Sequence, residues 1–318
     1  MSVAETGAQL AERYHRDVVG PLLLARWPQL SYAAARLGSG SDVLGLDDEL
    51  SRDHDWGLRL DVLVAAELVG AVNAHLEESL PATYEGRPAR FVTTWSEGER
   101  AQTEVGTARD LAVFRLGLDP RDGLDPVAWL GLTGQSVLEV VAGPVFVDTA
   151  GELTRIRQAL RWYPDDVWRY VLAADWNRLA EEMPLAGRAG QRGDDTGSRV
   201  VMARLVRTTM HLGFLLERSW PPYAKWLGTA YARLPVAGPT ADGLARALGA
   251  ASWRDREGAL VEVLETLLDR QGRLGLPRPD RATGPFWDRP FRTVVPDVAA
   301  LLLAEVTDPA VQRLPPGV

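Results

Sequence analysis

The hydrophobic pattern of this chain changes near residue 150, and that change limits the folds open to it. Over about the first 120 residues, stretches with helical spacing of apolar residues alternate with short runs of strand-forming residues. From about Leu153 onward the apolar residues recur at helical spacing, with hardly any β-branched runs. Alternation favours a layered arrangement of helices on a sheet, whereas uninterrupted helical periodicity favours a bundle. We therefore predict an α+β protein, with a small mixed-sheet domain over 1–150 followed by an all-helical domain over 151–318.

Each part carries its own set of expected elements. In the first part the spacing predicts a helix within 5–30, a strand at 58–64, a helix at 65–80, β-rich pieces at 89–95 and 101–107, and a helix at 108–117. In the second part it predicts helices at 151–161, 164–183, 198–218, 221–233 and 254–271. Glycine and proline content predicts a loop at 186–198 and irregular structure at 275–291.

Composition narrows the class of protein. The formal net charge of −8 disfavours a nucleic-acid binder, because affinity for a phosphate backbone comes chiefly from clustered Lys and Arg. The chain has no cysteine, so disulfides and thiolate metal sites are excluded. Its N-terminal residues do not match a secretory signal, and its apolar runs are broken by charge before the roughly 20 residues that a membrane span needs. We expect a cytoplasmic protein that does not enter a membrane.

One window, "RLGSGSDVLGLDDELSRDHDWG" at 36–57, combines a small-residue turn with paired carboxylates. Gly38, Ser39 and Ser41 offer backbone N–H groups and hydroxyls that can cradle phosphate oxygens. Asp53 and Asp55 are separated by one residue, so on a strand they would share one face. Two carboxylates so close repel each other, and a divalent cation such as Mg²⁺ makes the arrangement favourable. A phosphate loop beside a metal-binding pair is the equipment for phosphoryl or nucleotidyl transfer.

The same residues have a simpler interpretation. Gly-Ser and Asp-x-Asp strings occur by chance, and the window can also be a solvated turn followed by an acidic surface loop. An EF-hand calcium loop fits poorly, because the regular Asp-x-Asp-x-Asp-Gly spacing and the terminal Glu are missing.

The order Leu37-Gly38-Ser39, thirteen residues, then Asp53-His54-Asp55 resembles the nucleotidyltransferase superfamily that includes DNA polymerase β and the aminoglycoside and lincosamide nucleotidyltransferases. The last glycine of the superfamily's extended pattern falls at Gly45, two places later than usual. The acidic run, together with segments such as "AGPVFVDTAGELT" and "ERSWPPYAKW", also looks like an uncharacterised bacterial family, a domain of unknown function, within that superfamily.

The resemblance implies roles for these residues. Asp53 and Asp55 would hold the metals of a two-metal Mg²⁺ site, and Ser39 would contact the triphosphate of an NTP donor. A third acid, on another strand, would complete the site. Glu104, on the strand expected at 101–107, is the first choice as metal ligand or proton acceptor, and Asp148 in "VFVDTAG" is the alternative.

In the helical part, Lys225 is the only lysine of the chain, where 34 of the 35 basic residues are arginine. We expect Lys225 to contact the nucleotide triphosphate, as a basic residue of the helical domain does in related antibiotic-modifying enzymes. Arg199 and Asp194 would line the acceptor side. The basic stripe of Arg204, His211 and Arg218 has helical spacing, and we interpret most of it as a solvated face.

The sequence therefore predicts a metal-dependent nucleotidyltransferase that moves NMP from an NTP to an acceptor hydroxyl and releases pyrophosphate. A small-molecule acceptor is favoured over a nucleic acid because the chain is acidic. Two alternatives stay open. The acceptor would be a protein or a tRNA, as in toxin–antitoxin nucleotidyltransferases, or the chain would be a catalytically inactive nucleotide-binding regulator.

Overall fold

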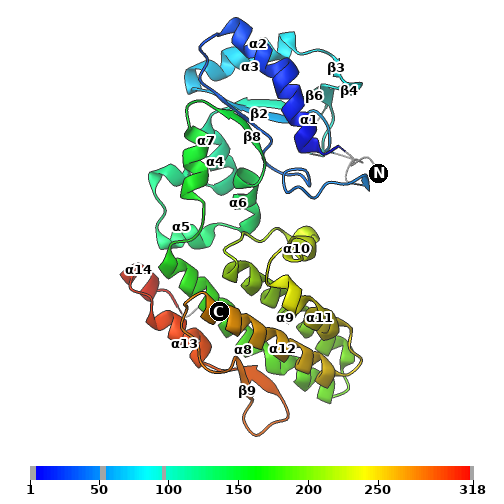
Figure 1. The fold of residues 1–318 in the computed structure, drawn as a ribbon, viewed down its shortest axis with the longest axis vertical. Helices are drawn as coiled ribbons and strands as arrows, with labels where there is room; N and C mark the ends of the chain where they lie inside the picture. The colour runs from blue at the N-terminus through cyan, green and yellow to red at the C-terminus, as the bar shows by residue number, and fades with distance from the viewer. Residues whose placement is uncertain (1–4, 51–54, 95–97, 316–318) are drawn as a thin grey trace. The chain divides into compact units, whose positions relative to one another are not determined.

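A computed structural model describes residues 5–50, 55–94 and 98–315, and divides the chain into two compact units (Figure 1). The first unit comprises Met1–Leu124 and Gln135–Arg161, and the second comprises Asp125–Gly134 and Trp162–Val318. The division therefore falls at residue 161 and not at residue 150, and the ten residues from Asp125 to Gly134 belong to the second unit. The segment at 144–151 lies within the first unit, because its strand is part of the sheet of that unit.

The first unit is built on a four-stranded mixed sheet, as predicted. Its strands are β1 (Ala33–Ala35), β2 (Leu60–Leu63), β7 (Thr103–Gly106) and β8 (Val145–Asp148), in the order β7-β2-β1-β8. β1 is antiparallel to both β2 and β8, whereas β2 and β7 are parallel. β1 was not predicted from the sequence, because its three residues are alanines, which favour helices over strands.

The helices of the first unit lie on both sides of this sheet (Figure 1). On one side are α1 (Gly7–Tyr14), a π-helical turn (His15–Val19), α2 (Gly20–Arg26) and α3 (Val69–Ser79). On the other side are α4 (Ala108–Leu116), α6 (Gly134–Val141) and α7 (Glu152–Ala159). The apolar core lies on the first side, where Leu60 and Val62 of β2 pack against residues of α1 to α3. Because side chains alternate along a strand, the other side receives Arg59, Asp61 and Leu63.

Short elements complete the first unit. They are η3 (Ala66–Leu68), β3 (Thr83–Tyr84), β4 (Arg87–Pro88), β5 (Arg90–Phe91), β6 (Arg100–Ala101) and η4 (Pro120–Asp122).

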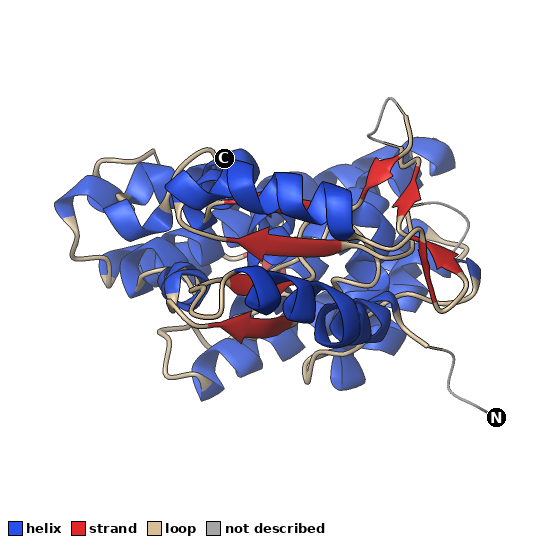
Figure 2. Ribbon diagram, turned by 90° about the horizontal axis from the view of Figure 1, so that it is seen from above, coloured by secondary structure: helices blue, strands red, loops and turns tan. Residues whose placement is uncertain are grey.

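The second unit is a helical bundle with one small hairpin. Its helices are α5 (Pro126–Gly131), α8 (Asp165–Gln191), α9 (Asp195–Leu216), α10 (Ala224–Tyr231), α11 (Ala237–Gly249), α12 (Trp253–Arg273), α13 (Asp297–Ala304) and α14 (Pro309–Gln312). The hairpin pairs β9 (Thr283–Pro285) with β10 (Arg292–Val294). The helical prediction is confirmed apart from this hairpin, which lies partly within the stretch expected to be irregular. Helices predominate throughout the described chain (Figure 2).

The loop predicted at 186–198 is mostly wrong. α8 continues to Gln191 and α9 already begins at Asp195. The glycines of this stretch serve close packing: a Cβ at Gly187 would lie 2.7 Å from the Phe291 ring, and one at Gly190 would lie 2.5 Å from the Trp253 ring. Glycine therefore stays in the helix because two aromatic rings approach its backbone.

No helix in the described ranges is both long enough and apolar enough to cross a membrane.

Candidate active site

The small-residue turn follows β1 and depends on Gly38. This residue has a φ of 78°, a conformation that favours glycine. Its N–H donates to the carbonyl of Glu139 over 2.7 Å. A Cβ here would lie only 2.5 Å from Nη2 of Arg115. The turn thus needs glycine both for its backbone angle and for the close approach of a guanidinium group.

A buried ion pair holds the turn from within. The Arg36 guanidinium donates to both carboxylate oxygens of Asp42, with Nε–Oδ2 2.7 Å and Nη2–Oδ1 2.9 Å, and both side chains are buried. Nη2 of Arg36 also donates to the carbonyl of Ser39 over 3.0 Å, and Nη1 donates to the carbonyl of Leu37. Charge-assisted bonds of this kind are strong, so the backbone of the turn is held in one arrangement.

Arg59 ties Asp55 to the same turn. Its Nη1 donates over 3.1 Å to the carbonyl of Ser39 and over 3.1 Å to the carbonyl of Asp55. Burial lowers the pKa of Arg59 to about 10, so its guanidinium stays charged at neutral pH.

The expectation that the Asp-x-Asp pair lies on a strand is wrong for Asp55. This residue has a φ of 56° and lies in a bend, before β2 begins at Leu60. Its Oδ1 accepts a hydrogen bond from the N–H of Thr94 over 2.6 Å. The left-handed backbone at Asp55 and the positive φ of 154° at Gly57 turn the chain before it enters the sheet. Asp53 and His54 lie outside the described residues.

Two carboxylates face each other on neighbouring strands. Asp61 of β2 and Glu104 of β7 are register partners in the parallel pair, so their side chains leave the same face of the sheet. Oδ2 of Asp61 accepts from the N–H of Leu37 over 2.9 Å. Burial raises the pKa of Asp61, against the opposing effect of the nearby Arg36 and Arg59. Glu104 is more exposed and is paired with Arg100, whose Nη2 lies 2.6 Å from Oε1.

These features surround one cavity of about 630 Å³ in the first unit. It is lined by charged side chains of both signs, by polar groups and by apolar residues: Arg36, Leu37, Ser39, Arg59, Leu60, Asp61, Leu63, Thr93, Arg100, Gln102, Glu104, Val105, Gly106, Thr107, Asp110, Leu111, Phe114, Arg115 and Glu139. Of the residues that the sequence analysis selected, Ser39 and Glu104 line it. Gly38 adjoins it through Arg115. Ser41 and Asp55 are not among the lining residues.

Asp148, the alternative third acid, lies at the other end of the sheet. It is the register partner of Ala33, whereas Asp61 is opposite Ala35, next to the turn. Oδ2 of Asp148 accepts from the N–H of Thr154 over 2.8 Å and from its hydroxyl over 2.7 Å. A separate small cavity of about 100 Å³ lies there. The structure therefore places Glu104, and not Asp148, in the cavity with Ser39.

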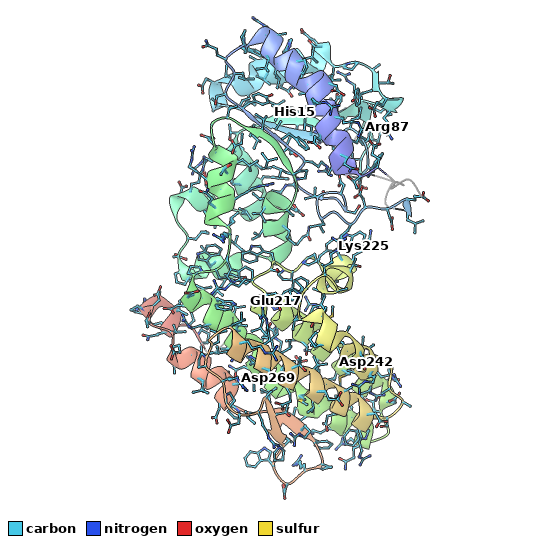
Figure 3. All side chains as sticks on the ribbon, viewed as in Figure 1. His15, Arg87, Glu217, Lys225, Asp242 and Asp269 are labelled. Atoms are coloured by element: carbon cyan, nitrogen blue, oxygen red, sulfur yellow. The ribbon has the colours of Figure 1, made fainter. Side chains whose placement is uncertain are left out.

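The two selected cations of the second unit have protein partners. Lys225 lies near the start of α10, with Nζ 4.9 Å from the ring centroid of Trp226 (Figure 3). Arg199 of α9 donates from Nε to Oδ2 of Asp195 over 2.7 Å and from its Nη atoms to the carbonyls of Leu248 and Ala250. About 17 residues of α9, or roughly 25 Å of helix, separate Arg199 from the end that leads to α10. The expected roles, Lys225 as a triphosphate contact and Arg199 on the acceptor side, stay predictions.

Each residue of the basic stripe lies beside an acidic side chain, and Asp194 caps a helix. Arg204 lies 2.5 Å from Glu182 and Arg218 lies 3.1 Å from Asp165. Nδ1 of His211 lies 2.6 Å from the buried carboxylate of Asp175. The side chain of Asp194 caps α9 by accepting from the N–H of Gly197 over 2.7 Å.

Four acids within the described ranges line the cavity, Asp61, Glu104, Asp110 and Glu139, and of these Asp61 and Glu104 are register partners on neighbouring strands. Among the residues that the structure describes, no three acidic or histidine side chains form a set that could hold a metal ion. Mg²⁺, however, is commonly held by one or two carboxylates together with substrate phosphates. The facing pair of Asp61 and Glu104 fits a cation of that kind when phosphate oxygens complete its ligands.

Residues of the cavity that were not predicted from the sequence include Arg36, Arg59, Asp61 and Arg115. A signal for two of them was present: in "GLRLDVLV" at 57–64, Arg59 and Asp61 alternate with leucine and valine, so they share one polar face of the predicted strand. Nothing local marks Arg36 or Arg115, because each acts through partners brought by the fold.

Comparisons with known proteins give a family match and a structural match. Residues 129–227 match the model of a family described as a domain of unknown function (DUF4037). That segment contains Lys225 and Arg199, and Glu139 from the cavity lining. The chain is also similar to the crystal structure of a nucleotidyltransferase-like protein from Exiguobacterium sibiricum 255-15, with 14% identity, a TM-score of 0.35, and coverage of 86% of this chain and 82% of that chain. No curated protein matches.

Proposed function

We propose that the first unit catalyses nucleotidyl transfer. The triphosphate of an NTP binds beside Ser39, the oxygen of an acceptor hydroxyl forms a bond to the α-phosphorus, and the bond to the bridging oxygen breaks to release pyrophosphate. One observation carries the proposal: a glycine-serine turn, arginine guanidinium groups and two facing carboxylates surround a single cavity of about 630 Å³. Such transfers depend mainly on positioning the substrate and neutralising its charge, and these residue types supply both.

The arginines suit the anionic part of the donor. Arg59 is charged and held in place by two carbonyls, so it meets a phosphate with little loss of side-chain freedom. Arg100 is about half exposed and already pairs with a carboxylate, and it can exchange that partner for a phosphate oxygen.

Asp61 and Glu104 would hold Mg²⁺ in this cavity. Asp53 and Asp55 are the metal ligands that the sequence predicts, although Asp55 does not line the cavity. A bound Mg²⁺ would neutralise charge on the phosphates. Glu104, the more exposed of the two facing acids, would take the proton from the acceptor hydroxyl. The N–H of Leu37 donates to the Asp61 carboxylate and holds it beside the turn.

The acceptor in this proposal is a small molecule with a hydroxyl group, because the net charge of −8 disfavours a large polyanion. The protein or tRNA acceptor and the inactive regulator are outcomes that the same experiment separates from it. Lys225 is the proposed triphosphate contact from the second unit.

The test measures pyrophosphate release from each of the four NTPs with Mg²⁺ and a panel of small hydroxyl compounds. Asp53→Asn, Asp55→Asn, Asp61→Asn and Glu104→Gln are compared with the native chain. We expect Asp61→Asn and Glu104→Gln to lower turnover by about 10²-fold or more, as loss of a charge-stabilising group does. Glu67→Gln changes an exposed acid on η3, outside the cavity, and should leave turnover unchanged.

Other results would contradict the assignment. Undiminished turnover in Asp61→Asn would show that the reaction does not take place in this cavity. NTP binding without pyrophosphate release would favour the inactive regulator, and transfer of label from ATP to proteins or tRNA alone would favour the macromolecular acceptor.

Lys225→Ala tests the second unit separately. We expect a higher apparent KM for the NTP at similar kcat, because a phosphate contact outside the reacting centre contributes mainly to binding. An unchanged KM would count against the contact.

A further inference from the structure

An aromatic ring stands exposed at the cavity. On α4, Ala108 and Ala112 are buried, but the side chain of Phe114 is 78% exposed and still contributes to the cavity lining. Isolated apolar residues on a surface are ordinary. A largely exposed aromatic ring on the wall of a charged cavity is different, because it offers a flat apolar face next to groups that attract anions.

The ring is held close to the glycine-serine turn. The guanidinium carbon of Arg115 lies 5.0 Å from the ring centroid of Phe114. Nη1 of Arg115 donates to Oε2 of Glu139 over 2.9 Å, which fixes the guanidinium. The same guanidinium borders Gly38, where a Cβ would come within 2.5 Å of Nη2. One guanidinium group therefore separates the exposed ring from the turn.

The separation between the turn and the Phe114 ring matches the separation between the phosphates and the base of a nucleotide. In an NTP one ribose separates the base from the α-phosphate. When the phosphates bind at the turn, the base therefore lies about one side-chain group away from the turn, where the Phe114 ring is. We propose that Phe114 is the surface on which the base of the donor nucleotide stacks. The inference rests on the proposed function and extends it to how the donor is selected.

Stacking has a consequence for selectivity. Every base presents a flat face, so stacking on Phe114 does not read the edge of the base. Purines present a larger face than pyrimidines. The donor class is therefore purine nucleoside triphosphates by preference, with ATP and GTP bound more tightly than CTP and UTP by a few-fold.

The test measures dissociation constants by calorimetry on the full chain with Mg²⁺, for ATP, UTP and inorganic tripolyphosphate. Tripolyphosphate carries the phosphates without a base. We expect Phe114→Ala to weaken ATP binding about 5- to 100-fold, in line with the loss of one base–aromatic stack. Its affinity for tripolyphosphate should not change, and the preference for ATP over UTP should disappear.

Two further variants complete the design. Phe114→Trp keeps an aromatic face and should bind ATP at least as well as the native chain. Val113→Ala removes another exposed apolar side chain from α4, one outside the cavity lining, and should change neither affinity.

Three results would overturn the inference. If ATP affinity in Phe114→Ala equals that of the native chain while both ligands still bind, the stacking role alone is wrong. If neither ATP nor tripolyphosphate binds the native chain, the proposed function fails and the stacking role fails with it. If Phe114→Ala lowers the sedimentation mass while ATP affinity is kept, the ring covers a contact between copies of the chain.

Discussion

The two units differ in the length of their elements and in where they place buried charge. In the first unit the strands of the four-stranded sheet have three or four residues, and Asp61 and Arg36, the buried partner of Asp42, line the cavity. In the second unit α8 has 27 residues and α9 has 22, and their contact is an apolar core. Buried charge requires matched partners, whereas hydrocarbon requires only complementary shape. Both units bury charged side chains, Arg36, Asp42 and Asp119 in the first and Asp175, Arg256 and Glu257 in the second. What distinguishes the first unit is that buried Arg36 also lines the cavity of the candidate site.

The buried pair of the first unit should give the largest effect. Arg36→Ala leaves the Asp42 carboxylate buried without its guanidinium partner, and we expect the unfolding free energy of the first unit to fall by about 3–5 kcal/mol. Amide hydrogen exchange, followed segment by segment, should show lost protection in β1 and β2 but not in α8 or α12. Arg16→Ala breaks a surface pair with Asp17 and should have no measurable effect.

A mutation in the apolar core of the second unit should destabilise that unit and leave the first unit unchanged. Leu264 of α12 is fully buried, so Leu264→Ala should lower the unfolding free energy by about 2–5 kcal/mol through lost burial and a cavity. Here exchange should rise in α8, α9 and α12 while β1 and β2 keep their protection. Leu248→Ala, at a half-exposed position of α11, serves as the milder control. Equal loss of protection in both units would show that they unfold as one cooperative body.

Glycine serves a different purpose in each unit. Gly38→Ala should destabilise the first unit by about 1–2 kcal/mol from the left-handed backbone, with a further loss from the contact with Arg115. Gly117→Ala is a matched control, because Gly117 has a φ of 79° and nothing within 4 Å of the added Cβ. Chemical denaturation measures both. If the two variants lose equal stability, the contact with Arg115 does not contribute to the loss.

In the second unit the glycine effect is one of space. Gly187 has an ordinary helical backbone, so Gly187→Ala gains about 1 kcal/mol of helix propensity but pushes a methyl group against the Phe291 ring. Overpacking of this kind usually costs about 1–3 kcal/mol, so we expect a small net loss. Combining Gly187→Ala with Phe291→Leu should recover part of that loss, measured by the same denaturation. No recovery would contradict the packing explanation.

Lowering the pH should change the stability contributed by Asp119, in the first unit, and by Glu257, in the second unit, in opposite directions. Hydrogen bonds from Arg121 hold the pKa of Asp119, in the first unit, below its ordinary value. The stabilisation from Asp119 is therefore present above the unfolded pKa and is lost as pH falls through the folded one. Burial raises the pKa of Glu257, in the second unit. Glu257 thus weakens folding at neutral pH, and that penalty disappears as pH falls toward the unfolded pKa.

Urea unfolding of Asp119→Asn and Glu257→Gln at pH 7 and pH 4 tests these signs. We expect the stability lost in Asp119→Asn to be smaller at pH 4 than at pH 7. Any stability gained in Glu257→Gln at pH 7 should shrink at pH 4. Differences that do not change with pH would mean that these carboxyl groups act through hydrogen bonding alone.

Much of the fold could be predicted from local pattern. The strand expected at 58–64 is β2, the helix at 108–117 is α4, and the helical second part is confirmed apart from the hairpin of β9 and β10. Predictions failed where composition and packing compete. The glycines near 190 indicate a loop by composition, yet the Trp253 and Phe291 rings keep Gly187 and Gly190 in α8.

The site was harder to predict than the fold. Ser39 and Glu104 were selected from sequence and line one cavity, but Asp61 was not selected. Asp55 lies in a bend with its carboxylate on the Thr94 N–H, although a strand was expected. A motif specifies which residue types are near one another along the chain, but not the backbone angle at each residue.

The sequence by itself determined the change from layered to helical structure, the absence of disulfides and the presence of a small-residue turn, because these depend on neighbouring residues and on composition. Only the tertiary structure decided which acids meet. Strand register places Asp61 opposite Glu104 beside the turn and sends Asp148 to the other end of the sheet. Register joins residues far apart in the chain through backbone hydrogen bonds and packing, and no local pattern of side chains encodes that pairing.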